Sequence, residues 1–205
     1  MEDDRSLLDR WRAGDEPSGR ALFQRYFDPM YRFFATKCAE PDELVQATFL
    51  ALVRARDQFG GRSSFRTYLY TIARHELYRH LRTLRRERQF EPEHSTIAEL
   101  VTTPRSRMAR SEDHARLIEV LRGLPVEQQT LLELHYWEDL DAAALADVFE
   151  VSPAAIRTRL SRARAALRER LVQQQAAAPD AVRSDEDLDT WTRAAGPGAP
   201  GPRPA

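Results

Sequence analysis

A cluster of arginines on one predicted helix is the feature of this chain whose chemistry is easiest to interpret. Residues 154–170 contain six arginines and one acid, whereas residues 124–150 contain seven acids and neither lysine nor arginine. An arginine can pair bidentately with a guanine edge or a phosphate, and serine and threonine can reach either group. At about 100° per residue, one arc of the helical wheel collects Arg157, Thr158, Ser161 and Arg162. We therefore expect these four side chains to contact duplex DNA.

The residues around these arginines predict a helix-turn-helix over residues 139–170. Ser152 can cap the second helix, and Pro153 suits its first helical position. An apolar stripe at spacings of three or four residues lies opposite the arginines and contains Ile156, Leu160, Ala163, Leu167 and Leu171. Such a motif places its second helix in the DNA major groove. The alternative is a solvated arginine-rich helix stabilised by ion pairs within the helix. Residues 154–170 contain a single acid, Glu169, so few such pairs can form.

A second basic face follows in the N-terminal half. Residues 74–88 contain six arginines and two acids, and aromatic residues lie among the basic ones. On a helix that starts at Phe65, one arc includes Tyr68, Thr71, His75, Arg79 and Arg82. Rings that stack on bases, beside guanidinium groups that hold the backbone, suit single-stranded DNA. Phe59 and Phe65 flank a polar loop that could close over an extruded base. The alternative is a solvated amphipathic helix whose tyrosines belong partly to the core.

Composition narrows the class of protein. The 205 residues have a formal net charge of −1 and a hydrophobic fraction of 42%, enough for small cores without a uniformly basic coat. The single cysteine, Cys38, excludes an internal disulfide and argues against a cysteine-based metal site. No apolar run is long enough to span a membrane, and the acidic N-terminus lacks a signal core. We therefore expect a cytoplasmic protein with no membrane insertion, no metal and no cofactor.

Helical periodicity throughout the chain predicts an all-α protein with two small helical domains joined by a flexible linker. The expected domains are residues 1–89 and 112–172, with the linker at 90–111 and a disordered Ala-, Pro- and Gly-rich tail at 173–205. Pro29 is expected to kink or divide the helix over residues 18–37. The other expected helices cover residues 5–12, 42–56, 65–88, 112–123 and 126–137.

Four segments in this order make the chain resemble a bacterial sigma factor of the extracytoplasmic-function (ECF) class. They are LLDRWRAGDEPSGRALFQRYF (7–27), DELVQATFLALVRARDQF (42–59), SSFRTYLYTIARHELYRHLR (63–82) and the stretch 124–171 that contains the helix-turn-helix. The class keeps two globular domains, called regions 2 and 4, and the resemblance covers about residues 5–88 and 112–171.

The resemblance implies a promoter-specificity subunit without catalytic residues, whose partners are core RNA polymerase, promoter DNA and an anti-sigma factor. Glu43, Leu44, Val45 and Gln46 match the helix that docks on the polymerase clamp helices. The loop from Phe59 to Phe65 matches the one that captures a flipped base of the −10 element, and Tyr68, Thr71, His75, Arg79 and Arg82 match contacts to the melted strand. Arg157, Thr158, Ser161 and Arg162 match the −35 contacts.

Four positions depart from the common pattern of the class. Ala47 replaces a frequent Glu on the docking helix, Tyr68 a usual Trp, and His75 a frequent Asn. The −10 base preference of the class therefore cannot be transferred to this chain. Glu150 replaces a frequent Gly in the helix-turn-helix turn, where a Cβ is costly if φ is positive.

Two other classes of function remain as alternatives. A free-standing helix-turn-helix regulator would bind duplex DNA without polymerase, but it would leave the N-terminal half unexplained. An enzyme or a protein-interaction adaptor is the second alternative, but no phosphate loop, metal-spaced cluster or nucleophile motif is present. The tail segment SDEDLDTW (184–191) could dock on the arginine-rich DNA faces, although a solvated tail explains the same composition.

Overall fold

The computed structural model describes residues 2–84, 90–101, 112–173 and 185–196, and this part of the chain is all-α as expected. The helices are α1 (Asp4–Arg12), α2 (Glu16–Ala35), α3 (Pro41–Ala55), a short 3₁₀ turn η1 (Arg56–Gln58), α4 (Phe65–Leu84), α5 (Ile97–Leu100), α6 (Glu112–Arg122), α7 (Val126–Tyr136), α8 (Ala142–Phe149), α9 (Pro153–Gln173) and α10 (Asp185–Ala194). None of these helices combines the length and apolar character that crossing a membrane requires.

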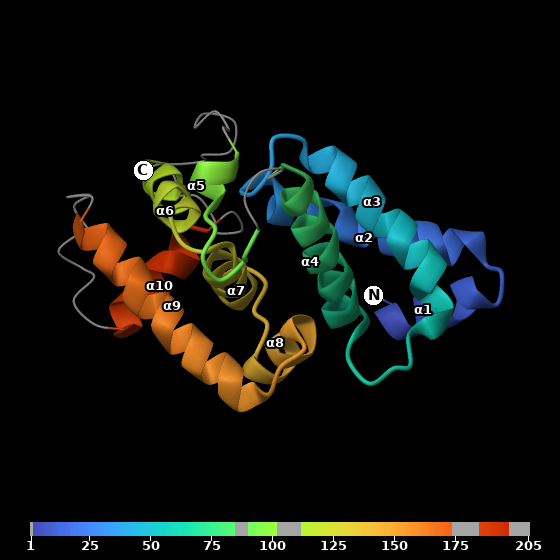
Figure 1. The fold of residues 1–205 in the computed structure, drawn as a ribbon. Coiled ribbons are helices and arrows are strands. Elements are labelled where there is room, and N and C mark those ends of the chain that lie inside the picture. Colours follow the sequence, from blue (N-terminus) through green and yellow to red (C-terminus); the bar gives the residue numbers. More distant parts are fainter. Residues whose placement is uncertain (1, 85–89, 102–111, 174–184, 197–205) are drawn as a thin grey trace, which may run out of the picture.

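Helices α1 to α4 form the N-terminal bundle (Figure 1). Asp3 caps α1 by accepting hydrogen bonds from the backbone N–H groups of Arg5 and Ser6. Leu8 of α1 and Leu22 of α2 are fully buried, and so is Leu69 of α4. Helix α2 runs continuously through Pro29, so the expected division of this helix is not observed.

Helices α6 to α9 form the C-terminal bundle, and α8 lies against α4 of the N-terminal bundle (Figure 1). One apolar cluster runs from α1 through α4 into α8 and the start of α9, so the two bundles share a core. A second cluster joins α6, α7, the C-terminal half of α9 and α10. The C-terminal bundle therefore has apolar side chains on two sides, one packed on the N-terminal bundle and one packed on α10.

The expected flexible linker is ordered over its first half. Phe90, Ile97 and Val101 are buried in the shared core, and Thr96 forms a reciprocal capping box with Glu99 at the start of α5. The backbone N–H of Val126 donates to the Ser95 carbonyl at 2.9 Å. Apolar residues thus fix residues 90–101 in place, which corrects the prediction there. Residues 102–111 lie outside the described residues.

A buried polar contact also crosses between the bundles. The ammonium group of Lys37, just after α2, pairs with the carboxylate of Glu133 on α7, and both side chains are almost completely buried. Glu133 also accepts hydrogen bonds from Thr36 Oγ1 at 3.1 Å and from Gln129 Nε2 at 2.8 Å. Burial lowers the pKa of Lys37, since a charged ammonium loses its hydration there.

The tail is not uniformly disordered, which corrects a second prediction. Residues 185–194 form α10, and its Leu188 is fully buried against the C-terminal bundle. The remaining tail positions, 174–184 and 197–205, lie outside the described residues.

Candidate nucleic-acid interface

Helix α9 has the two faces that the sequence predicts. Ser152 Oγ accepts a hydrogen bond from the backbone N–H of Ala155 at 3.2 Å, and Pro153 is the first helical residue. The apolar stripe is buried at all five predicted positions: Ile156, Leu160, Ala163, Leu167 and Leu171. The predicted DNA-contacting side chains are all exposed: Arg157, Thr158, Ser161 and Arg162. The helix thus exposes two arginines and two hydroxyl groups on one side while the opposite side keeps its core contacts.

The turn before α9 has the unusual backbone anticipated at Glu150. Asp141 caps α8 by accepting from the N–H groups of Ala143 and Ala144, and α8 ends at Glu150 in a left-handed conformation with φ 59° and ψ 41°. Glycine adopts this conformation without strain, whereas a residue with a Cβ does so at a cost of about 1 kcal/mol. The Glu150 side chain makes a compensating contact in the other bundle.

Glu150 reaches the helix that we expect to bind single-stranded DNA. Its carboxylate lies 2.5 Å from Arg74 Nη2 and 3.0 Å from His75 Nε2, both on α4. Burial alone would raise the pKa of Glu150, but the His75 hydrogen bond and the charges of His75 and Arg74 lower it below its ordinary value. His75, which we predict to contact the −10 element, is therefore held by Glu150 in the turn of the helix-turn-helix.

The aromatic residues of the expected base-capturing loop anchor it. Phe59 and Phe65 are both buried, and the Phe59 ring lies 5.0 Å from that of the half-buried Tyr68. Tyr68 donates its hydroxyl to the Ala55 carbonyl at 3.0 Å, and Arg12 donates to the Phe59 carbonyl at 2.7 Å. The two phenylalanines therefore fix the ends of the loop, and Tyr68 is the aromatic residue that remains partly accessible.

The remaining side chains of α4 that we predict to contact the −10 element lie further along the helix, away from this loop. Thr71 is half-buried and donates its hydroxyl to the Thr67 carbonyl at 3.0 Å. Arg79 and Arg82 are exposed, and Arg79 pairs with Glu76 of the same helix. Both arginines thus lie on the exposed part of α4, and Arg82 also lines a hollow between α4 and the C-terminal bundle.

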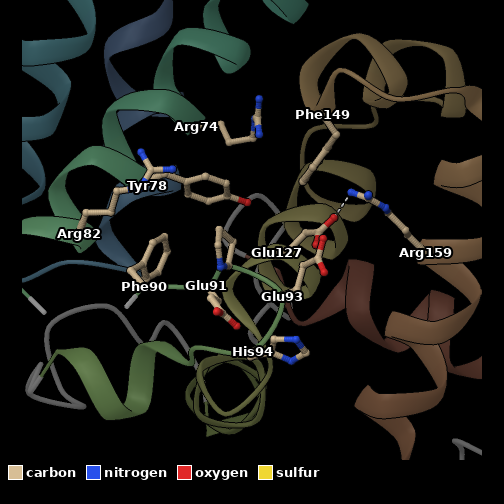
Figure 2. A pocket seen from close by; sticks show the side chains of 11 residues that line it. Arg74, Tyr78, Arg82, Phe90, Glu91, Glu93, His94, Glu127, Phe149 and Arg159 are labelled. Carbon is tan, nitrogen blue, oxygen red and sulfur yellow. Dashed lines mark hydrogen bonds and ion pairs between the residues drawn. The ribbon is translucent and has the colours of Figure 1, made fainter. Parts of the chain in front are cut away.

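A hollow of about 400 Å³ lies between α4, residues 90–94 and the C-terminal bundle, and Arg74, which also pairs with Glu150, lines it. Figure 2 shows Arg74 and Tyr78 on one wall, with Phe149 and Glu127 on the other. The Arg74 guanidinium lies 5.4 Å from the centre of the Tyr78 ring and 5.6 Å from that of Phe149. Burial raises the pKa of Glu127 despite its ion pair with Arg159. Sequence reasoning missed this hollow, because its walls come from segments far apart in the chain.

The predicted polymerase-docking residues divide between surface and core. Glu43 and Gln46 are exposed on α3, whereas Leu44 and Val45 are buried and support the helix from below. Beside Gln46, an apolar surface includes Phe27, Leu50 and Val53, which are 45%, 50% and 39% exposed. Gln46 and these three apolar residues line a hollow of about 310 Å³ between α2 and α3. Exposed apolar side chains gathered in this way are typical of a protein-interaction surface.

Comparison with known proteins agrees with this geometry. The chain matches Sigma-70 region 2 over residues 22–87 and Sigma-70 region 4 over residues 114–167. It is 33% identical to the ECF RNA polymerase sigma factor SigC of Mycobacterium tuberculosis, over 73% of this chain and 83% of that protein. It is 27% identical to the RNA polymerase sigma-H factor of Pseudomonas aeruginosa, over 82% of this chain and 93% of that protein.

A solved structure shares the fold. The structure of CnrH in complex with the cytosolic domain of CnrY covers 84% of this chain and 99% of its own, with a TM-score of 0.62 and 23% identity. Two family matches in the expected order and a relative of 33% identity together establish the class. The chain belongs to the extracytoplasmic-function sigma factors of the sigma-70 family, which are promoter-specificity subunits of RNA polymerase.

Proposed function

We propose that Arg157, Thr158, Ser161 and Arg162 read the −35 element of a promoter as duplex DNA. Their exposure on one face of α9, opposite the buried stripe, is the observation that supports this assignment most directly. The two arginines can pair with guanine edges or phosphates, and the hydroxyl groups can complete contacts in the major groove. We also propose that residues 112–172 act as the −35-reading domain and residues 1–89 as the −10-reading domain.

The melted −10 strand would lie along α4. Tyr68 offers a partly accessible ring for stacking, while Thr71, His75, Arg79 and Arg82 offer polar and basic groups further along the helix. Phe59 and Phe65 hold the ends of the base-capturing loop. Because His75 is paired with Glu150, a strand that contacts His75 must first displace the Glu150 carboxylate from it.

Core RNA polymerase would bind the exposed side of α3. Glu43 and Gln46 supply polar contacts, and the neighbouring Phe27, Leu50 and Val53 supply apolar area. Leu44 and Val45 would act by holding this surface in shape. Because salt screens charge–charge contacts but not apolar ones, loss of this apolar surface should weaken polymerase binding even at high salt.

An anti-sigma factor is a further expected partner. CnrH is seen in complex with the cytosolic domain of CnrY, and a second structural neighbour, the sigma factor RpoE of Bartonella quintana, is seen with the anti-sigma factor NepR. We propose that this chain is restrained in a comparable way, acts in the cytoplasm and has no catalytic activity of its own. Differential binding to the open strand would drive promoter melting without a cofactor.

In vitro transcription from fragmented genomic DNA tests the proposed function. Core RNA polymerase with the wild-type chain should give discrete new starts that share two spaced upstream motifs. The double variant Arg157→Ala/Arg162→Ala should lose these starts, whereas the exposed Arg20→Ala on α2 removes a charge elsewhere and should retain them. No new starts, together with tight duplex binding by the chain alone, would instead support a free-standing regulator.

A further inference from the structure

Helix α10 lies beside the C-terminal bundle (Figure 1), and its apolar side chains join the second apolar cluster of that bundle. Leu188 is fully buried, and Trp191 packs beside it against the second apolar cluster. Other members of this cluster form the apolar surface that we call the docking groove: Leu117, Val120 and Leu121 of α6, Leu132 and Tyr136 of α7, and Ala163, Leu167 and Leu171 of α9.

Polar contacts fix the register of α10 in this groove. Asp189 accepts a hydrogen bond from the Tyr136 hydroxyl and pairs with Arg164 Nε at 3.2 Å. The indole N–H of Trp137 donates to the Thr192 carbonyl at 3.1 Å. Burial, together with Asp189, raises the pKa of Tyr136 to about 12 and keeps its hydroxyl protonated as a donor. These contacts use Arg164 instead of the DNA-facing Arg157 and Arg162, so they do not match the tail docking considered from the sequence.

Most of the groove lies within the matched family domain, whereas α10, which covers the groove, lies outside it. The match to Sigma-70 region 4 spans residues 114–167 and so contains most of the groove, whereas α10 follows only after residues 174–184. The shared domain therefore carries an apolar face that α10 covers as an addition. An apolar face of this kind needs a cover in water, whether from the same chain or from a partner.

Helix α10 is short, and two of its polar groups are buried in the groove without a hydrogen-bond partner among the described residues. At ten residues, α10 is below the length at which an isolated helix is stable in water, so its folding depends on docking. Trp191 Nε1 and Thr192 Oγ1 are buried without a hydrogen-bond partner among the described residues, and each carries a desolvation cost. These features favour a helix that can leave the groove over a permanent part of the core.

We propose that α10 is a tethered, displaceable occupant of a docking groove and that it restrains assembly of the transcription complex until a partner's helix replaces it. The proposal rests on the sigma-factor function above. The partner's helix should resemble α10: amphipathic, with a large apolar pair three residues apart and a carboxylate that can meet Arg164. A short tether gives α10 an effective concentration of about a millimolar, so the partner must bind tightly to displace it.

Peptide exchange on the full chain tests the proposal. The probe is a fluorescent synthetic peptide with the sequence of residues 183–196, and its dissociation constant is measured by anisotropy. Leu188→Asp should release α10 and bind the peptide at least about tenfold more tightly than the wild type, the ratio that corresponds to about 1.4 kcal/mol. Thr190→Ala changes an exposed residue of the same helix and should behave like the wild type.

Several outcomes would overturn the proposal. Equal peptide affinity for Leu188→Asp and wild type would show that the groove does not exchange helices. Release of α10 alone should remove the helical circular dichroism of about its ten residues, whereas a larger loss in Leu188→Asp and in the milder Asp189→Ala would show that α10 is an integral part of the core. If light scattering shows that the wild type is a dimer and Leu188→Asp a monomer, α10 occupies the groove of a second copy instead of its own.

A transcription assay distinguishes failure of this proposal from failure of the proposed function. With core RNA polymerase, Leu188→Asp should reach half-maximal promoter-specific transcription at a protein concentration about tenfold lower than the wild type, in line with the expected shift in groove occupancy. Tight peptide binding with unchanged transcription would overturn the restraint. No transcription from either protein would contradict the proposed function, while the peptide arm, which needs no polymerase, would still report on the groove.

Discussion

Replacing Lys37 with methionine should strongly destabilise the chain, because it leaves a buried carboxylate without its cation. The Lys37 side chain is 0% exposed and that of Glu133 is 2% exposed, so water cannot take over the lost contact. In Lys37→Met, Glu133 would keep only the neutral donors Thr36 and Gln129. Removing one partner of a buried ion pair costs about 3–5 kcal/mol, and we expect Lys37→Met to lower the free energy of unfolding by this amount.

The double variant Lys37→Met/Glu133→Gln supplies the control. It removes both charges, keeps an acceptor for Thr36, and should recover at least about 2 kcal/mol of the loss, since a buried ion pair and a neutral pair of similar volume are often of similar stability. Urea unfolding followed by circular dichroism measures both variants, and the coupling energy comes from the complete cycle with Glu133→Gln. A loss below about 1 kcal/mol in Lys37→Met, or strict additivity of the two single changes, would refute the reasoning.

Three further predictions concern strain, pH and packing. Glu150→Gly removes the strain of positive φ whereas Glu150→Gln keeps it, so the glycine variant should be about 1 kcal/mol more stable in urea unfolding; equal stabilities would contradict this. Burial lowers the pKa of His135 below 6.5, so stability should be complete above pH 6.5 and decrease as the pH falls through the lowered value. His135→Gln should flatten this decrease in thermal melts across that range. In Gly19→Ala the new Cβ would lie 2.6 Å from Trp11 Nε1, which should cost about 1–3 kcal/mol in urea unfolding despite better helix propensity.

The helices and the exposed polar side of α9 could be predicted from the sequence because their signals are local. The cap at Ser152, the proline that follows and the apolar stripe all lie within about twenty residues and are found as expected. The positive φ at Glu150 could also be anticipated, from a residue that stands where the class frequently has glycine. The predicted contacts to DNA and polymerase remain predictions that the experiments above address.

The relation between the two bundles could not be predicted, because it depends on pairs far apart in the chain. Glu150 meets Arg74 and Glu133 meets Lys37 across sequence separations of 76 and 96 residues, and helical periodicity carries no information about such pairs. The same limit applies to Leu44 and Val45, whose burial is decided by packing. For the tail, composition correctly indicated few apolar residues, but Leu188 and Trp191 suffice for α10 because the groove supplies the rest of the apolar surface.

The buried contact at Lys37 also gives the chain a built-in chemical reporter. Lys37 is the single lysine in the sequence and Cys38 the single cysteine, and both are buried where the bundles meet. Burial raises the pKa of the Cys38 thiol to about 12, so the reactive thiolate is scarce while the bundles are closed. Apart from the N-terminal amine, a lysine-directed reagent finds its one target in the chain at this contact. The rate of modification at these two adjacent residues therefore measures how often the contact opens in the unaltered protein, alone or in the presence of core RNA polymerase.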